Sequence, residues 1–263
     1  IVIGRKGSGK TAIFWRVRDV IRDNPNVLVV DLKPDGYQLR KFKEQLVNLL
    51  TAGTKEHTLT AFWTYLLLGE LINKIFESDY RRFYGRNPKI TAALDEIRPH
   101  RDHFMENLEG DFSERMASLL DRIAVEFKEK YGGSDSKKFL TTSEVTDLIY
   151  KSDIREVEAA VLGYLSLKDR TVTLLDNIDK GWGAHGVDSD DVTIVTALMD
   201  ALRKLERQAG RADVELDWLL FLRNDVYELL IDQQSDRGKE DTIFVDWDSP
   251  AALRSVVDKR IAV

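Results

Sequence analysis

The chain has 263 residues, 43% hydrophobic and 32% charged, which is typical of a globular protein, and its apolar runs are shorter than the ~18 residues that cross a bilayer. It contains no cysteine, which excludes disulfide bonds, cysteine-ligated metal centres and thiol catalysis. Its net charge of −6 gives no overall basic field that would attract nucleic acid, although a local basic patch is compatible with that sum.

The first 36 residues read as a strand, a glycine-rich turn, a helix and a second strand. Residues 1–3 are β-branched, residues 11–22 place apolar side chains on one helical stripe, and residues 27–32 form a second apolar run. Continuous apolar runs are typical of buried parallel strands. The pattern therefore predicts a βαβ unit with a right-handed crossover.

From residue 37 to residue 170 the periodicity is almost entirely helical. Helices are predicted at 39–50, 59–76, 90–97, 114–131, 142–150 and 154–167. Helix breakers are expected at residues 51–53, 85–88, Pro99 and 131–136. Since the segment holds no convincing strand, we interpret it as a large helical insertion into an α/β domain.

The α/β pattern then resumes. Strands are predicted at 171–176, 216–222 and 242–245, and helices at 191–208, 226–231 and from Ser249-Pro250 onward. A loop rich in glycine, residues 180–188, follows the first of these strands. We therefore divide the chain into a first core part (1–36), the insertion (37–170) and a second core part (171–263).

Residues 4–11 match the phosphate-loop pattern G-x-x-x-x-G-K-[ST], and they lie between an apolar strand and an amphipathic helix, as that motif requires. Glycines let the backbone N–H groups turn toward phosphates, and the positive end of the helix points at the same place. Lys10 would contact the β- and γ-phosphates of ATP, and the Thr11 hydroxyl would ligate Mg²⁺. The predicted nucleotide-binding residues are Gly4, Arg5, Lys6, Gly7, Ser8, Gly9, Lys10, Thr11 and Ala12.

Two acidic residues follow the third predicted strand. Asp176 stands at its carboxyl end, where it would hold Mg²⁺ through water, and Asp179 would orient or deprotonate the attacking water. The alternative interpretation is an ordinary strand-terminal aspartate followed by a turn residue. The phosphate loop favours the functional interpretation, less strongly for Asp179, because most hydrolytic relatives have glutamate at the base position.

Three polar residues end the fourth predicted strand. Ligands of open α/β sheets bind outside the carboxyl ends of the strands, so Arg223 or Asn224 would sense the γ-phosphate. Asn224 and Asp225 are explained equally well as caps of the next helix. Arginine is a poor cap, so we predict that Arg223 belongs to the catalytic site.

Two other patterns carry less weight. His100 and His103 have the spacing of a metal pair, but no third ligand is visible, and Pro99 indicates a solvated loop. Residues 81–86 mix arginine with aromatic residues, which is compatible with stacking on nucleic acid, but nearby acidic residues dilute the positive charge.

Three segments together resemble a known family. Residues 4–11, 174–179 and 221–227 resemble the additional-strand P-loop ATPases of the KAP, STAND and AAA+ group, and in particular a bacterial P-loop ATPase family first noticed in cyanobacteria. The signatures that resemble this bacterial family are GRKGSGKT (4–11), DLKPDGY (31–37) and FLRNDVY (221–227), so the insertion is mostly unmatched. The resemblance implies that residues 244–260 lead from the last core strand into a helical lid, and that the chain is part of a longer protein.

Two features depart from that family. Asp176 is followed by Asn177, where KAP and STAND proteins often have Asp-Asp or Asp-Gly. There is also no clear arginine finger: Arg203, Arg207 and Arg211 lie where AAA+ relatives place one, but a solvated helix face is the favoured explanation for them.

The expected fold is a three-layer P-loop NTPase sandwich with a parallel five-stranded sheet in the order 5-1-4-3-2. Residues 216–222 then lie between residues 1–3 and 171–176, and the insertion packs beyond the edge of the sheet. This order would bring Lys10, Asp176, Asp179 and Arg223 around one pocket.

The expected function is a Mg²⁺-dependent ATPase, slow in turnover, that acts as a nucleotide-dependent switch. The resemblance adds homo-oligomers, sensor or effector partners, and a role in bacterial anti-phage defence. The alternative is an AAA+-like nucleic-acid motor or loader. Because the chain shows no secretion signal, we expect a cytoplasmic protein that binds no membrane.

Overall fold

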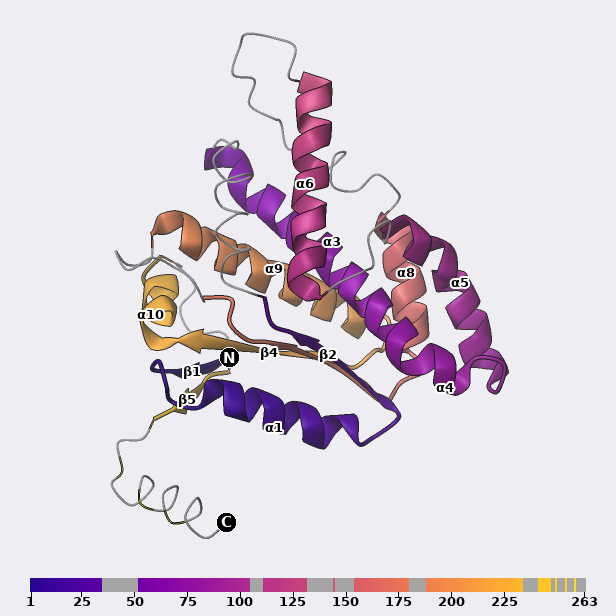
Figure 1. Ribbon diagram of the computed structural model, residues 1–263, viewed down its shortest axis with the longest axis horizontal. Helices are drawn as coiled ribbons and strands as arrows, with labels where there is room; N and C mark the ends of the chain where they lie inside the picture. Colours follow the sequence, from indigo (N-terminus) through magenta and orange to yellow (C-terminus); the bar gives the residue numbers. More distant parts are fainter. Residues whose placement is uncertain are drawn as a thin grey trace.

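The computed structural model describes residues 1–34, 52–104, 111–131, 154–179, 188–233 and 241–246, together with positions 144, 249, 254 and 258. Figure 1 shows the arrangement of its helices and strands. The strands are β1 (Val2–Gly4), β2 (Val27–Leu32), β3 (Arg170–Leu175), β4 (Leu216–Arg223) and β5 (Ile243–Val245). The helices are α1 (Lys10–Arg22), α3 (Ala52–Ile75), the π-helix η2 (Phe76–Tyr80), α4 (Arg81–Phe83), α5 (Pro88–Phe104), α6 (Phe112–Tyr131), α8 (Ile154–Leu165), α9 (Ser189–Arg211) and α10 (Asn224–Gln233).

The five strands form one parallel sheet in the order β2-β3-β4-β1-β5. Read from the β5 edge, this is 5-1-4-3-2. β4 pairs with β1 through Phe221, opposite Val2, and with β3 through Leu219, opposite Leu174. β4 therefore separates the strand before the glycine-rich loop from the strand that ends at Asp176.

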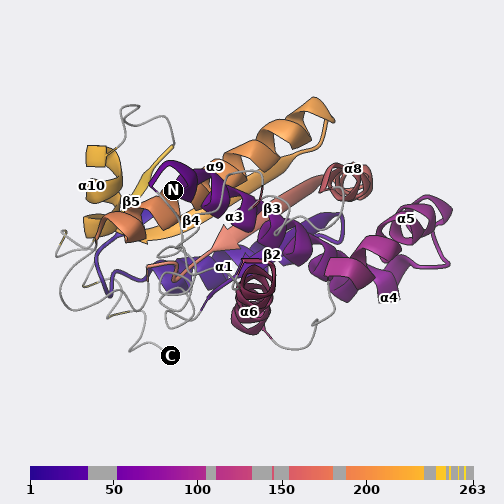
Figure 2. The ribbon, with the colours of Figure 1, turned by 90° about the horizontal axis from the view of Figure 1, so that it is seen from above.

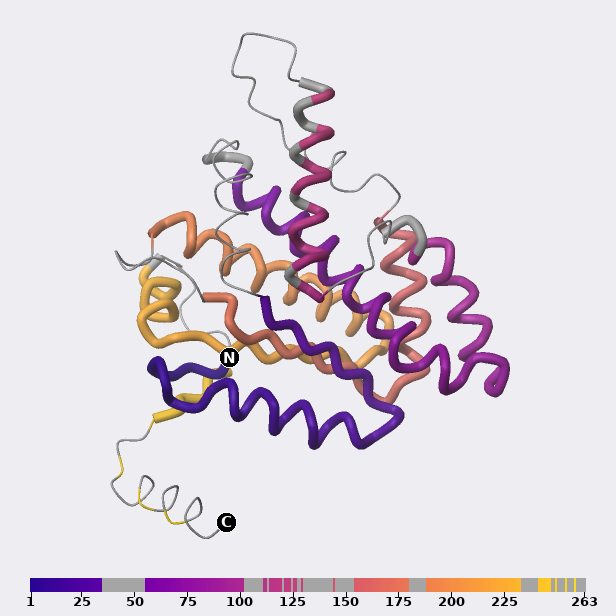
Figure 3. The backbone as a smooth tube through the Cα atoms, viewed as in Figure 1, coloured from indigo at the N-terminus to yellow at the C-terminus, as the bar shows by residue number. Residues whose placement is uncertain are grey.

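The two faces of the sheet bury different sets of side chains, because successive residues of a strand point to opposite sides. Val2, Val29, Val172 and Phe221 pack with Phe14 of α1 on one face. The opposite face is covered by α9, α10 and part of the insertion; its strand residues include Ile3, Leu28, Val30, Leu175 and Leu222. Figure 3 shows α1 and α9 on opposite sides of the sheet, so the core has three layers, and Figure 2 shows from above that α3 lies beside α9.

Part of the insertion lies on the sheet instead of beyond its edge, so that expectation is wrong for α3. This helix packs against α9 and β2, and the Trp63 indole nitrogen donates a hydrogen bond of 3.1 Å to the carbonyl oxygen of Ile194. Trp63 and Phe62 are fully buried. The buried side chains of α3 therefore pack with the apolar side chains on the face of the sheet opposite α1.

Two expected helix breakers lie inside helices. Gly53 is in α3, which begins at Ala52, and Pro99 is inside α5, so His100 and His103 are helical residues and not part of a loop. α5 continues through Pro99 because Ile90, Leu94 and Ile97 are buried and α5 packs along α8. Tertiary packing here outweighs the backbone hydrogen bond that proline removes.

Other boundaries agree with the sequence within a few residues. The turn at residues 85–88 is present, with Gly85 at φ 73°. The predicted helices at 39–50 and 142–150, the linker at 132–136, the glycine-rich loop at 180–187 and the lid beyond residue 246 lie outside the described residues, single positions excepted. None of the helices in the described ranges combines the length and apolar character needed to cross a bilayer.

Candidate functional site

The glycine-rich loop connects β1 to α1 at the carboxyl edge of the sheet. Gly7 and Gly9 have φ angles of 84° and 92°, which L-residues with side chains rarely adopt. A Cβ atom on Gly4 would lie 2.5 Å from the Ser8 hydroxyl oxygen and 2.8 Å from the Val245 carbonyl oxygen. Each of these glycines is therefore required by the backbone of the loop itself.

Lys10 begins α1, and its side chain folds back over the loop. Its Nζ atom donates hydrogen bonds to the carbonyl oxygens of Gly4 (2.7 Å) and Arg5 (3.0 Å). Partial burial lowers the pKa of Lys10, while the charges of Asp179 and Asp176 oppose that effect. The ammonium group thus lies at the centre of the loop with two carboxylates near it.

Thr11 connects the loop to β3. Its hydroxyl donates a hydrogen bond of 2.8 Å to Oδ2 of Asp176, a residue 165 positions away in the sequence. Asp176 is 3% exposed, and its backbone N–H donates to the Leu32 carbonyl oxygen at 3.0 Å, which fixes the residue beyond the end of β3. Nζ of Lys33 lies 3.7 Å from the same carboxylate oxygen. Lys33 was not among the predicted site residues, although its position directly after a predicted strand indicated that it lies at the carboxyl edge of the sheet.

Asn177 explains the departure from the Asp-Asp or Asp-Gly sequence of the resembling family. Its φ angle is 66°, in the left-handed region. Asparagine, aspartate and glycine are the residues that adopt this conformation most readily. Asn177 therefore satisfies the same backbone requirement by a different side chain.

Asp179 is buried and contacts the end of β4. Its Oδ2 atom accepts a hydrogen bond of 2.9 Å from the backbone N–H of Arg223. Burial raises the pKa of the Asp179 carboxyl, and the Arg223 N–H together with the charges of Arg223 and Lys10 only partly offsets this rise. A carboxylate with a raised pKa is better suited to accept a proton near neutral pH than an exposed aspartate.

The side chain of Arg223 points to a different acid. Its Nε donates to Oδ1 of Asp225 at 3.0 Å, and a second guanidinium nitrogen contacts Oδ2 of the same residue. The charges of Arg223 and Asp225 nevertheless act on Lys10, so both lie near the loop. The Oδ1 atom of Asn224 is buried and accepts no hydrogen bond from the described residues, so the structure shows no capping bond there.

The carboxyl edge of the sheet therefore brings five predicted site residues together. Lys10 and Thr11 follow β1, Asp176 and Asp179 follow β3, and Arg223 is the last residue of β4. The candidate arginine fingers lie elsewhere. Arg203 and Arg207 line a groove of about 1150 Å³ with Arg170 and Asp217, the residues at the amino ends of β3 and β4. Arg203 also pairs with Asp200 at 2.9 Å. Arg203 and Arg207 therefore lie at the opposite edge of the sheet from the glycine-rich loop of the same molecule.

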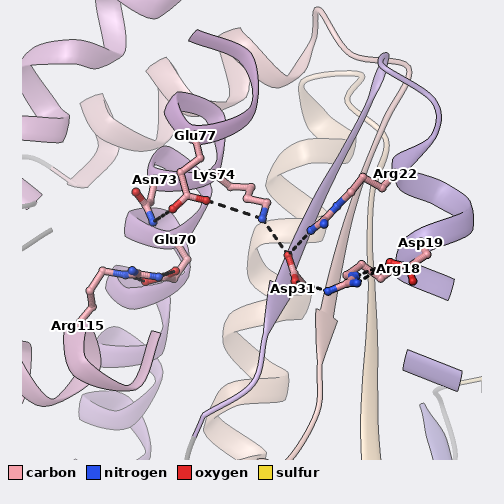
Figure 4. Close-up of polar contacts among 9 residues, drawn as sticks. All are labelled: Arg18, Asp19, Arg22, Asp31, Glu70, Asn73, Lys74, Glu77 and Arg115. Carbon is pink, nitrogen blue, oxygen red and sulfur yellow. Dashed lines mark hydrogen bonds and ion pairs between the residues drawn. The ribbon is translucent and has the colours of Figure 1, made fainter. Parts of the chain in front are cut away.

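A second polar cluster, which the sequence analysis missed, joins α1, β2 and α3. Figure 4 shows the Asp31 carboxylate of β2 between cations from both helices. Its Oδ1 atom lies 3.2 Å from Arg22 and 2.9 Å from Lys74, and its Oδ2 atom lies 3.6 Å from Arg18. The spacing of Arg18 and Arg22 on one helical face was the available signal. The cluster links the helix of the glycine-rich loop to the insertion.

Comparisons with known proteins give one significant similarity among curated proteins. The chain is 24% identical over 275 residues to the "Putative transposon gamma-delta 80.3 kDa protein" of Escherichia coli (strain K12), and the match covers 100% of the chain but 34% of that protein. No known family profile matches the chain, and no solved structure matches it significantly. Within the described residues no group of three or more histidine, aspartate or glutamate side chains is arranged to hold a metal ion.

Proposed function

We propose that this chain is a Mg²⁺-dependent ATP-binding and ATP-hydrolysing P-loop module that works as a nucleotide-dependent switch. The observation that carries the proposal is the 2.8 Å hydrogen bond from the Thr11 hydroxyl to Asp176. It joins the loop to the end of a strand that is separated from β1 by β4. An additional strand in this position is what the resembling ATPases have, and it supports the same subclass.

The residues of the loop fit a nucleoside triphosphate. The two left-handed glycines let the backbone turn sharply, and the crowding at Gly4 shows that the loop is closed tightly on β1 and β5. The start of α1 adds free N–H groups and the positive end of a helix dipole, which favour phosphate. Lys10 would exchange its contacts with two carbonyl oxygens for contacts with the β- and γ-phosphates.

Thr11 and Asp176 fit a magnesium ion, because both supply hard oxygen atoms and they already lie within hydrogen-bond distance of each other. Mg²⁺, when bound, neutralises charge on the β- and γ-phosphates. Thr11 would ligate the ion, and Asp176 would hold it through water. Lys33 forms an ion pair with the Asp176 carboxylate and would help to orient it at the strand end.

Asp179 and Arg223 would act on the attacking water and on the γ-phosphate. Asp179 would accept the proton of the water, since burial raises its pKa above that of an exposed aspartate. Arg223 would report the γ-phosphate by leaving Asp225 for the phosphate oxygens, and its backbone N–H would keep Asp179 oriented. A change at Arg223 reaches α10 directly, because that helix starts at the next residue.

Calorimetric titration with ATP and Mg²⁺ tests the proposal. We expect Lys10→Ala to reduce ATP affinity at least about tenfold, because it removes a charge-assisted contact to phosphate. Asp176→Asn should keep the fold and weaken the dependence of affinity on Mg²⁺. Lys89→Ala, which removes an exposed lysine from the insertion, is the matched control and should bind as the wild type does. Unchanged Mg²⁺–ATP affinity in Lys10→Ala would overturn the phosphate-loop assignment.

A nucleic-acid motor is the second candidate, and the name of the similar E. coli protein, a putative transposon protein, is the observation in its favour. A motor would show DNA-stimulated ATP hydrolysis and would use Arg203, Arg207 or Arg211 as a finger toward a neighbouring subunit. A switch would change its oligomer size with nucleotide and without DNA. Phosphate release with and without DNA, together with light scattering with ATP and with ADP, separates the two.

A further inference from the structure

The end of the insertion that includes η2, α4 and the start of α5 has an unusual backbone. The π-helix η2 joins α3 to α4 and has five residues, Phe76–Tyr80. π-Helical turns are rare and occur frequently at functional sites. Figure 1 shows α4 and α5 at the opposite end of the molecule from the glycine-rich loop, so this backbone feature does not serve the candidate ATP site.

The π-helical turn lines up a stack of aromatic rings. The ring centroids of Phe76 and Tyr80 are 5.6 Å apart at an interplanar angle of 25°, and those of Tyr80 and Tyr84 are 4.5 Å apart at 22°. Arginines lie over the same rings: Arg101 is 4.6 Å from the Phe76 centroid, and Arg98 is 5.1 Å from that of Tyr84. Such alternation of flat rings and guanidinium groups is suited to planar, negatively charged ligands.

A cavity of about 430 Å³ opens beside this stack. Its lining consists of Phe76, Glu77, Tyr80, Arg81 and Arg101. The Nε atom of Arg101 is buried and has no hydrogen-bond partner within the described part of the chain. An unsatisfied buried donor costs free energy, and a hydrogen-bond acceptor of a ligand in the cavity would satisfy it.

The surface around the cavity is positively charged. Its exposed cations are Arg81, Arg82, Arg86 and Lys89, and among the described residues none of these forms an ion pair with an acid. The acidic residues nearby are mostly engaged. Asp79 is buried against Lys168 and the Tyr164 hydroxyl, each at 2.5 Å, and Asp95 pairs with Arg98 at 3.0 Å.

We propose that this surface, which we call the Arg–Tyr surface (residues 76–89 with Arg98 and Arg101), binds single-stranded nucleic acid. A base enters the cavity beside Phe76 and Tyr80, and the exposed Arg81, Arg82 and Arg86 contact the adjacent phosphates. Glu77 accepts hydrogen bonds from the amino group of the base. A nucleobase offers a flat ring to Phe76 and Tyr80 and amino hydrogens to Glu77, whereas an acidic side chain offers neither, so nucleic acid is the partner that the lining fits better.

Fluorescence anisotropy with a labelled oligodeoxycytidylate, whose bases carry an amino group, tests the proposal in the absence of ATP and ADP. We expect Arg81→Glu/Arg82→Glu to weaken binding at least about tenfold and to lower the salt slope by about 0.7 for each lost phosphate contact. Arg16→Glu/Arg254→Glu, the same charge change at two exposed positions outside the Arg–Tyr surface, is the control and should bind as the wild type does. Equal loss in both variants, or no binding by the wild type, overturns the proposal.

A second pair of variants tests the ring. Tyr80→Phe keeps the aromatic face and should keep the affinity, whereas Tyr80→Leu should lose about tenfold with unchanged circular dichroism. An unlabelled duplex that competes as well as the single strand would overturn the stacking role, since paired bases offer no free ring face. Displacement by poly-glutamate as efficient as by the single strand would identify an acidic protein as the partner instead.

Because this assay needs no ATP, its result is independent of the phosphate-loop assignment. Lys10→Ala should lose Mg²⁺–ATP binding and keep the binding of the oligonucleotide. Arg81→Glu/Arg82→Glu should lose the binding of the oligonucleotide and keep Mg²⁺–ATP binding. The two proposals therefore fail separately.

Discussion

At the scale of single residues, Asp179 combines two properties that a sequence cannot show. Its position three residues after a strand predicted nearness to the site, but its hydrogen bond to the Arg223 backbone depends on β4 lying beside β3. Its burial, which raises the pKa, depends on the packing of the whole carboxyl edge. Lys33 was missed for the same reason, since its contact with Asp176 is set by the pairing of β2 with β3.

The pKa of Asp179 leads to a prediction about stability and pH. Folding raises the pKa of the Asp179 carboxyl above 3.8, so the folded protein binds this proton more tightly than the unfolded chain does. The protonated carboxyl therefore favours the folded state below pH 3.8, and this contribution to stability is lost as the pH rises through the pKa of the folded state. We therefore expect Asp179→Asn to gain stability relative to the wild type as pH rises through that window, by at most about 1.4 kcal/mol per pH unit.

Urea unfolding of both proteins at several pH values from 4 to 8 measures this difference. Asp213→Asn, at an exposed turn position, is the control and should follow the wild type at every pH. A difference between Asp179→Asn and the wild type that stays constant over the range would contradict the assigned burial of a titrating carboxyl.

At the scale of secondary structure, strands were predicted better than the helices of the insertion. Buried parallel strands are continuous apolar runs, so β2 and β4 were located almost to the residue. α3 is instead buried on several sides, by α9, β2, α6 and α8, which removes the polar face that marks a surface helix and its ends. Its start at Ala52 and the passage of α5 through Pro99 follow from such tertiary contacts.

A buried ion pair joins α3 and α6, in addition to the hydrogen bond from Arg122 of α6 to the Tyr65 hydroxyl of α3. Figure 4 shows Arg115 of α6 facing Glu70 of α3, with two hydrogen bonds of 2.6 Å, and the two side chains are 14% and 6% exposed. Burial raises the pKa of Glu70, and Arg115 opposes that rise. We expect Arg115→Met to destabilise the protein by about 3–5 kcal/mol, because it leaves a buried carboxylate without its partner.

The double variant Glu70→Leu/Arg115→Met serves as the control, since it removes both charges and should recover most of that loss. Chemical unfolding of the two variants and the wild type measures the coupling. A double variant no more stable than Arg115→Met would show that the pair does more than neutralise a buried charge.

At the scale of the whole molecule, the place of β4 between β1 and β3 could be predicted because Arg223 and Asn224 end β4 with polar groups that belong near the loop. The position of the insertion on the sheet could not be predicted from the sequence. Two of its attachments differ in chemistry: Trp63 is buried against α9, and Lys74 contacts Asp31 on β2 with both side chains partly exposed. No pattern in one segment specifies contacts between two distant segments.

These two attachments should respond differently to salt. The Debye length falls from about 10 Å at 0.1 M to about 3 Å at 1 M, which weakens partly exposed ion pairs and leaves buried apolar contacts intact. We expect amide hydrogen exchange to quicken a few-fold at residues 74–80 in high salt and to stay unchanged at residues 59–68. In Lys74→Met the exchange should be fast at both salt concentrations. An equal effect of salt on amide exchange at residues 59–68 and 74–80 would contradict the assignment of one attachment to apolar packing and the other to an ion pair.

The Asp31 cluster has a further consequence. Arg22 and Lys74 share a single oxygen, Oδ1, so one negative charge serves donors from α1 and from α3. A carboxylate accepts several hydrogen bonds at once, so the cations of both helices balance the charge of Asp31 together. A displacement of either helix would leave the remaining cation and Asp31 in an altered geometry. Movement of the helix that follows the glycine-rich loop would therefore change a contact that holds the insertion.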